Sequence, residues 1–213
     1  MIVIRWKRMT TGGSVTLPYE AIAKGNIMHL LLASQSPRRR ELLGLFNIPF
    51  IVRTADIDET MDPSAAPYDE VARVSGLKAA AISRGEEDIV VAADTIVVCQ
   101  GKVLGKPHST EEAKAMLRLL SGRDHQVMTG MTVLQGSRAI TVTEVTDLHF
   151  RELSEKEIED YVATGEPMDK AGAYGIQGGA ALFCSRMEGD YYNVVGLPVC
   201  RLSQILQELA PVR

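Results

Sequence analysis

Residues 30–45 read Leu-Leu-Leu-Ala-Ser-Gln-Ser-Pro-Arg-Arg-Arg-Glu-Leu-Leu-Gly-Leu, and this stretch decides the fold class. The apolar run at its start predicts a buried strand over residues 30–33. Ser36 followed by Pro37 is typical of a helix start, because serine caps the first free N–H groups and proline suits the first turn. A strand that leads directly into a helix is the repeating unit of α/β proteins, so we expect that class here.

The same alternation continues along the chain. A continuous apolar run over 89–93 predicts a central strand that is buried on both faces. Ser109 with Glu112, and Ser154 with Glu157, match the capping box, so each pair is expected to open a helix. Further strands are expected over 50–53, 95–99, 102–104, 126–134 and 139–150, and helices over 36–45, 68–84, 109–122, 154–165 and 197–209.

Residues 1–27 differ from the rest of the chain, because they are rich in glycine, threonine and lysine and show no sustained period. We interpret them as an N-terminal extension, either a mis-assigned start or a loosely attached arm. Residues 28–213 contain no repeat, low-complexity segment or linker, and we expect them to form a single domain. The length of 213 residues suits one domain or two small lobes, given roughly 100–200 residues per domain.

Composition excludes several classes of protein. With 46% hydrophobic and 23% charged residues the chain is typical of a globular protein, and its net charge of −4 argues against binding nucleic acid or an anionic membrane. Cys99, Cys184 and Cys200 lack a ligand spacing, which favours a reducing compartment over a disulfide framework or a zinc site. No run of roughly eighteen apolar residues is present. We therefore expect a cytoplasmic protein.

The turn between the first strand and helix carries an unusual concentration of positive charge. Arg38, Arg39 and Arg40 fall in the first helical turn, where the helix dipole disfavours cations and free N–H groups favour anions. The hydroxyls of Ser34 and Ser36 add donors beside them. The segment is therefore either a phosphate-binding site or a solvated basic turn.

Acidic residues occur at two places that suit a metal or a general base. Asp94 follows the predicted strand 89–93, and ligands of α/β sheets gather beyond the carboxyl ends of strands. The alternative is that Asp94 caps a turn. Glu59 lies in the acidic loop 56–62, which is either a solvated surface or the source of a magnesium ligand.

Two lysines and a glycine-rich loop complete the candidates. Lys106 follows the short hairpin, and Lys78 lies in an alanine-rich helix where a solvent-facing position is the alternative. The loop 169–179 is neither a dinucleotide-binding motif nor a P-loop, and it is either an ordinary mobile loop or a base-recognition segment. In the second case the amide of Gln177 offers both a donor and an acceptor to a base edge. No nucleophile elbow or histidine spacing supports a Ser-His-Asp hydrolase.

Taken in order, nine segments of this sequence resemble the Maf family of nucleotide pyrophosphatases. They are LLASQSPRRRELL (31–43), DIDE (56–59), LKA (77–79), VAADTIV (91–97), GKP (105–107), LSG (120–122), HQVMTG (125–130), YVATGEPMDKAGAYGIQG (161–178) and VVGLP (194–198). Each segment alone is weakly specific, whereas the ordered set spans nearly all of residues 28–213. The resemblance implies an elongated mixed α/β sheet with flanking helices, two lobes around a cleft, a fold shared with inosine triphosphate pyrophosphatases, and commonly a homodimer.

The resemblance also implies roles for individual residues. Asp94 matches the catalytic carboxylate, which activates water or binds the metal that does, and Glu59 matches a metal-site residue for Mg²⁺ or Mn²⁺. The residues that match those around the triphosphate are Ser36, Arg38, Arg39, Lys78 and Lys106. Those at the family's selectivity positions are Arg38, Thr95 and Gln177.

These selectivity positions resemble the branch of the family that acts on dTTP and UTP. That branch has arginine after the proline, Ala-Asp-Thr, and Tyr-Gly-Ile-Gln-Gly, as at Arg38, 93–95 and 174–178 here. The branch for 7-methyl-GTP carries Trp, Ser-Asp-Gln and Lys-Ser-Glu instead. We therefore expect hydrolysis of dTTP or UTP to monophosphate and pyrophosphate in a housecleaning role. A nucleotide-binding regulator of cell division without catalysis and a 7-methyl-GTP pyrophosphatase are the alternatives.

Overall fold

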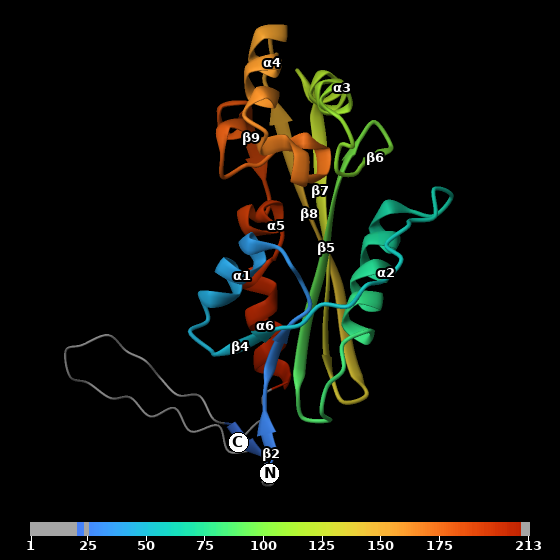
Figure 1. Ribbon diagram of the computed structural model, residues 1–213, viewed down its shortest axis with the longest axis vertical. Helices are drawn as coiled ribbons and strands as arrows, with labels where there is room; N and C mark the ends of the chain where they lie inside the picture. The colour runs from blue at the N-terminus through green and yellow to red at the C-terminus, as the bar shows by residue number, and fades with distance from the viewer. Residues whose placement is uncertain (1–20, 24–25, 210–213) are drawn as a thin grey trace, which may run out of the picture.

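The computed structural model describes residues 21–23 and 26–209, and a seven-stranded mixed sheet forms its centre (Figure 1). Strand β3 pairs in parallel with β4 and β5, and the other pairings in the sheet are antiparallel. The mixed α/β class is therefore confirmed. In order across the sheet the strands are β4 (Phe50–Val52), β3 (Leu30–Leu32), β5 (Ile89–Cys99), β7 (Asp124–Gln135), β8 (Arg138–Phe150) and β9 (Cys184–Glu188), with β6 (Lys102–Leu104) paired to β5.

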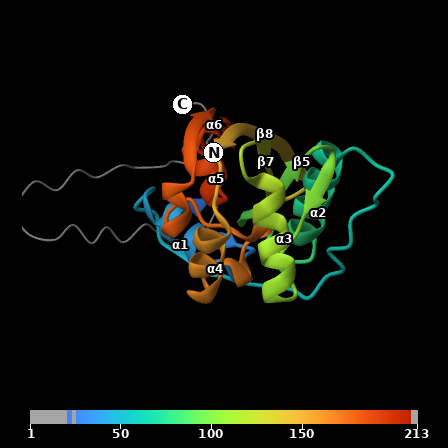
Figure 2. The same ribbon diagram turned by 90° about the horizontal axis from the view of Figure 1, so that it is seen from above.

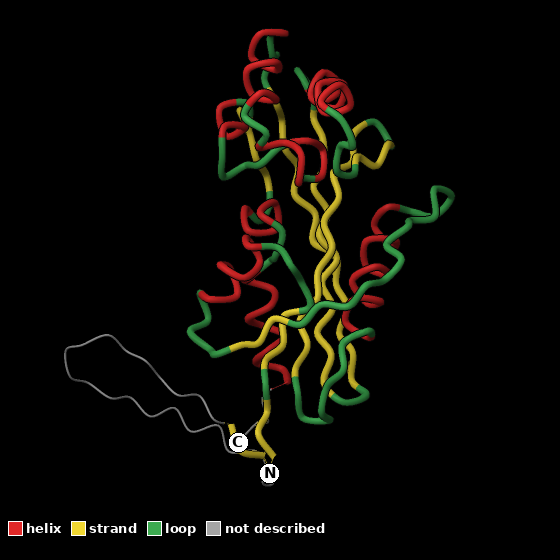
Figure 3. Tube along the Cα trace, viewed as in Figure 1, coloured by secondary structure: helices red, strands yellow, loops and turns green. Residues whose placement is uncertain are grey.

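Helices cover both faces of the sheet. Figure 2 shows α2 on one side of the long strands and α1, α5 and α6 on the other. Figures 1 and 3 show that α3, α4 and β9 gather at the opposite end of the long strands from β4 and α6, so the molecule is elongated with two lobes. The helices are α1 (Pro37–Gly44), α2 (Pro67–Ala80), α3 (Thr110–Leu120), α4 (Glu155–Ala163), α5 (Tyr191–Val195) and α6 (Val199–Leu209), with short 3-10 turns η1 (Glu166–Asp169), η2 (Ala171–Ala173) and η3 (Gly179–Leu182).

The predicted helix starts are present, with one difference. Ser36 accepts a hydrogen bond from the Arg39 N–H, and Ser154 with Glu157 forms a complete capping box. Ser109 also caps its helix, but the Glu112 carboxylate accepts from the His108 N–H instead of the Ser109 N–H. The second predicted capping box is therefore only half formed.

Strand β5 differs from the prediction in a way that bears on the site. Two strands, 89–93 and 95–99, were expected with Asp94 beyond the end of the first, but they form one continuous strand. The reason is β7, which pairs with β5 without interruption from Ile89 to Val98. The prediction that Asp94 lies at the carboxyl end of a strand is therefore wrong. The predicted burial of 89–93 on both faces is confirmed.

The expected N-terminal extension lies mostly outside the described residues. β1 (Ala21–Ala23) pairs antiparallel with β2 (Asn26–Met28), apart from the main sheet, and β2 crosses the predicted boundary. The boundary at residue 28 stays a prediction. Among the described helices, none is long and apolar enough to cross a membrane.

Candidate active site

A cavity of about 1460 Å³ lies between the two lobes and is lined by segments from across the chain. At one end the cavity is lined by the β3–α1 turn and the acidic loop, and at the other end by the β6 and η1–η2 segments. All of the predicted site residues line it: Ser36, Arg38, Arg39, Glu59, Lys78, Asp94, Thr95, Lys106 and Gln177. Arg40 is exposed and does not line the cavity. Two arginines of the predicted cluster of three therefore line it, Arg38 and Arg39.

One side of the cavity consists of Glu59, Lys78 and Asp94, which we call the carboxylate wall. The Lys78 ammonium lies 2.7 Å from Asp94 Oδ1 and 2.8 Å from Glu59 Oε2, so it donates to both carboxylates. The side chains of Lys78 and Asp94 are each only 14% exposed. The alternative of a solvent-facing lysine is therefore wrong, and the wall carries one cation between two anions.

A glycine explains how the carboxylate wall is assembled. Gly130 on β7 is the ladder partner of Asp94 on β5. A Cβ at Gly130 would lie 2.3 Å from the backbone oxygen of Val71 in α2, which no side chain can accommodate. The absence of a side chain there allows α2 to pack directly on the sheet. The last turn of α2 then brings Lys78 to Asp94.

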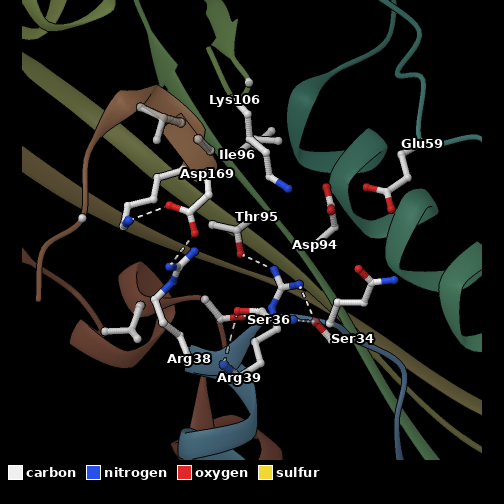
Figure 4. Close-up of a pocket in the computed structure, with 18 of the residues that line it drawn as sticks. Ser34, Ser36, Arg38, Arg39, Glu59, Asp94, Thr95, Ile96, Lys106 and Asp169 are labelled. Carbon is white, nitrogen blue, oxygen red and sulfur yellow. Dashed lines mark hydrogen bonds and ion pairs between the residues drawn. The ribbon is translucent and has the colours of Figure 1, made fainter. Parts of the chain in front are cut away.

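The opposite side, the arginine wall, consists of Arg38 and Arg39 at the start of α1. Arg39 donates from Nε to the Gly196 carbonyl at 2.7 Å, from Nη2 to Thr95 Oγ1 at 2.8 Å and from Nη1 to Ser34 Oγ at 3.3 Å. All three acceptors are uncharged, and Figure 4 shows the guanidinium of Arg39 between Thr95 and Ser34. A guanidinium has five N–H donors, so two remain for a ligand.

The electrostatics of Arg39 follow from this setting. Burial lowers the pKa of the Arg39 guanidinium, and the nearby Asp94 charge acts in the opposite direction. Gly196 supplies the carbonyl that accepts from Arg39 Nε, and its φ is +120°. Any other residue at this position would be strained in the left-handed region.

The other cations of the cavity are held less tightly. Arg38 Nη1 lies 3.3 Å from Asp169 Oδ2, and that carboxylate also contacts Lys170 at 2.6 Å. Lys106 is exposed, and Figure 4 shows its amine pointing toward the middle of the cavity. Within the described part of the chain, the Lys106 amine has no ion-pair partner. It is thus placed to receive an anion.

The glycine-rich loop is anchored by two residues that the sequence reasoning missed. The Tyr161 hydroxyl accepts from the Gly175 N–H at 3.0 Å and donates to Glu166 Oε1 at 2.9 Å. Glu166 Oε2 accepts from the Gly179 N–H at 3.1 Å. Gln177 lies between these anchored points and is exposed to the cavity. Both anchors fall within segment 161–178, but no local pattern indicated that they contact the loop.

A neutral histidine supports the cavity from behind. Tyr174 lines the cavity, and its hydroxyl lies 2.9 Å from Nε2 of the buried His125. Phe150 packs edge-on against both rings. Burial lowers the pKa of His125 to about 4, so this histidine is uncharged near neutral pH.

The carboxylate wall fits the donors that a hard divalent cation prefers. Asp94 Oδ1 and Glu59 Oε2 converge on one point, since both lie within 2.8 Å of the Lys78 nitrogen. Among residues 21–23 and 26–209, no group of three or more acidic, histidine or cysteine side chains gathers around a common point. Mg²⁺ typically takes one or two carboxylates and completes its shell with water and phosphate oxygens. The two carboxylates of Asp94 and Glu59 match the protein ligands in that requirement.

Comparison with known proteins identifies the family. A family model described as Maf-like protein matches residues 29–209. A Bacillus cytotoxicus protein named dTTP/UTP pyrophosphatase is 48% identical over 179 residues, which cover 84% of this chain and 94% of that relative. A protein of the same name from Geobacillus sp. (strain WCH70) is 49% identical over 181 residues, covering 84% and 97%. The solved structure of a HAM1 protein from Coxiella burnetii is 15% identical, covers 85% of this chain and 100% of that chain, and gives a TM-score of 0.46. The chain belongs to the Maf family.

Proposed function

We propose that this protein hydrolyses dTTP and UTP to the nucleoside monophosphate and pyrophosphate. The observation that carries the proposal is one cavity lined both by the cations Arg38, Arg39 and Lys106 and by the carboxylates of Asp94 and Glu59. A triphosphate needs cationic donors along its oxygens, and attack by water needs a nearby carboxylate. The curated relatives described above carry the name of this activity.

The cationic side chains bind and orient the triphosphate. Arg39 offers its two remaining N–H donors, and Lys106 and Arg38 add charge around the same space. Ser36 lines the cavity at the start of α1, where backbone N–H groups favour an anion. Held in this way, the α-phosphate faces the carboxylate wall. Most of the catalytic effect in this chemistry comes from such positioning and charge stabilisation.

Asp94 is the residue that we assign to the water. Its Oδ1 is held by Lys78, which fixes the carboxylate on β5. As the water oxygen bonds to the α-phosphorus, Asp94 accepts the proton. The bond from the α-phosphorus to the bridging oxygen breaks, and pyrophosphate leaves with the electron pair. Glu59 and Asp94 would hold Mg²⁺ or Mn²⁺, and a bound ion supplies positive charge that offsets the charge of the phosphate oxygens.

Selectivity for the pyrimidine base is proposed to come from Arg38, Thr95 and Gln177. All three line the cavity, and the Gln177 amide has both a donor and an acceptor for a base edge. We further propose that the protein acts in the cytoplasm as a homodimer and removes non-standard pyrimidine nucleotides before they are incorporated.

The test is pyrophosphate release from dTTP, UTP, CTP, 5-methyl-UTP, 7-methyl-GTP, ITP and ATP, with Mg²⁺ and with EDTA. Release from dTTP and UTP that requires the metal supports the proposal. If pyrophosphate is released preferentially from 7-methyl-GTP, the substrate is that of the other branch of the family and the proposed substrate is wrong. If a folded protein releases no pyrophosphate from any of these nucleotides, a nucleotide-binding regulator is favoured instead.

A further inference from the structure

Thr129 lies directly behind Thr95, a partner of Arg39, and does not line the cavity. It is the ladder partner of Thr95 on β5, and its side chain is 0% exposed, whereas Thr95 lines the cavity. The two hydroxyl oxygens lie 2.9 Å apart. On its other side, Thr129 Oγ1 lies 2.9 Å from the backbone carbonyl oxygen of Asn193 in α5.

Elementary counting of hydrogens fixes the direction of these bonds. A threonine hydroxyl has one hydrogen to donate, and the Asn193 carbonyl can only accept, so Thr129 donates to Asn193. The Thr129 oxygen must then accept from Thr95, whose only hydroxyl hydrogen points into the interior. Thr95 Oγ1 in turn accepts from Arg39 Nη2 at 2.8 Å. All three hydrogen bonds are therefore donated in the same direction: Arg39 to Thr95, Thr95 to Thr129, and Thr129 to the Asn193 carbonyl in α5. We call this chain of hydrogen bonds the relay.

The far end of this relay is held rigidly. The Asn193 side chain is buried, and its Nδ2 donates to the Val127 carbonyl at 3.0 Å and to Thr146 Oγ1 at 2.9 Å. The Gly196 carbonyl, which follows α5, accepts from Arg39 Nε. Arg39 is thus tied to the α5 segment twice, once directly and once through the two threonines. If the relay ran the other way, the Thr95 hydrogen and an Arg39 hydrogen would face each other.

We propose that Thr129 is a positioning residue that orders the Arg39 guanidinium for phosphate binding. Its hydroxyl obliges Thr95 to present a lone pair to Arg39 Nη2. Without that hydroxyl the Thr95 hydrogen loses its acceptor at Thr129 and can turn toward the guanidinium, where it would occupy the position that accepts from Arg39 Nη2. The inference rests on the proposed function for the nature of the ligand, but binding of inorganic pyrophosphate tests it without requiring turnover.

The test compares two substitutions of Thr129 by calorimetric titration of the full chain with inorganic pyrophosphate. Thr129→Val keeps the shape of the side chain without the hydroxyl and is expected to raise Kd about tenfold, because a buried donor loses its partner. Thr129→Ser keeps the hydroxyl and is expected to bind as the wild type does. Thr132→Val is the matched control, since Thr132 is 3% exposed on the same strand and contacts Ser75 and Thr141 away from the cavity.

A double substitution separates positioning from a general structural effect. In an Arg39→Lys background the Nη2 donor is already absent, so Thr129→Val is expected to weaken binding little further. An equal loss in both backgrounds, wild-type affinity in Thr129→Val, or a loss in Thr129→Ser as large as in valine would each overturn the proposal.

Two further controls separate this proposal from a folding defect and from the proposed catalytic function. If Thr129→Val fails to fold by circular dichroism, Thr95→Val breaks the next link and is expected to show the same tenfold loss, and unchanged binding there would overturn the proposal. A chain that shows the expected binding pattern but releases no pyrophosphate from nucleotides would contradict the proposed function and leave this inference supported.

Discussion

The arginine wall and the carboxylate wall line one cavity, but the cations Arg39 and Lys78 differ in the groups that contact them. Arg39 donates to a serine, a threonine and a backbone carbonyl, and among the described residues no carboxylate is in direct contact with its guanidinium. Lys78 is held between Asp94 and Glu59, so its charge is already matched. The Arg39 charge is therefore ordered by neutral acceptors, whereas the Lys78 charge is already matched by carboxylates in the absence of a ligand.

This difference indicates how the two walls respond to a nucleotide. Neutral acceptors fix the position of Arg39 and leave its charge available, so we expect Arg39 to be preorganised for phosphate. The carboxylate wall holds a cation where a metal ion is proposed to bind, so Lys78 and the ion compete for the same oxygens. The following predictions separate the two walls, from the largest expected effect to the smallest.

Asp94→Asn removes a charge from the carboxylate wall alone. We expect kcat for dTTP to fall by roughly 10²–10⁴-fold, as is usual when a general base is lost. Affinity for inorganic pyrophosphate is expected not to weaken, since the arginine wall is intact. Steady-state pyrophosphate release and calorimetry measure the two quantities. Asp147→Asn, at an exposed aspartate on β8 outside the cavity, is the control. Wild-type kcat in Asp94→Asn would contradict the assignment.

Acid places a positive charge on the buried His125, which contacts the cavity residue Tyr174. The pKa of His125 is about 4 in the folded protein and about 6.5 when unfolded, so the unfolded chain binds the proton first. The stability that depends on neutral His125 is present above pH 6.5 and is lost as pH falls toward 4, by up to about 3 kcal/mol.

Urea unfolding across that pH range measures this effect. His125→Gln is expected to lower the dependence of unfolding free energy on pH relative to the wild type. Equal slopes in the two proteins would show that His125 is not held neutral.

Arg39→Lys tests the ordered donors of the arginine wall. Lysine keeps the charge but cannot reproduce the three directed hydrogen bonds, so we expect KM to rise by roughly 10–100-fold with a smaller change in kcat. The neighbouring Arg40→Lys, at an exposed position outside the cavity lining, is the matched control. Similar kinetics in the two variants would remove the distinction between the walls.

Lys78→Met tests whether the carboxylate wall is a cation site. Without the ammonium, Asp94 and Glu59 face each other with no cation between them, so we expect Mn²⁺ to bind about tenfold more tightly in the absence of nucleotide. Calorimetric titration with MnCl₂ measures the change. Lys106→Met, which removes a cavity lysine that contacts neither carboxylate, is the control. Unchanged or weaker binding in Lys78→Met would argue against competition between lysine and metal.

Much of the fold could be predicted from local pattern. The helix start at Ser36 was predicted from a serine followed by proline, and that at Ser154 from a serine and a glutamate three positions apart. The site residues proposed from pattern and from the family resemblance all line one cavity, and their roles stay predictions. The break placed at Asp94 was wrong because a polar residue inside an apolar run looks like a strand end. The roles of Tyr161 and Glu166 were missed because their contacts to the glycine-rich loop leave no periodic signal.

The sequence by itself determined the kinds of element, their order and the chemical groups available, because periodicity and capping are properties of neighbouring residues. Only the tertiary structure decided which of those charges are matched. Lys78 meets Asp94 because Gly130 lets α2 pack on the sheet, and Arg39 meets a carbonyl 157 positions away because Gly196 adopts a positive φ that turns the chain there. Whether a cation is neutralised or held free for a ligand depends on such long-range approaches, which no local pattern encodes.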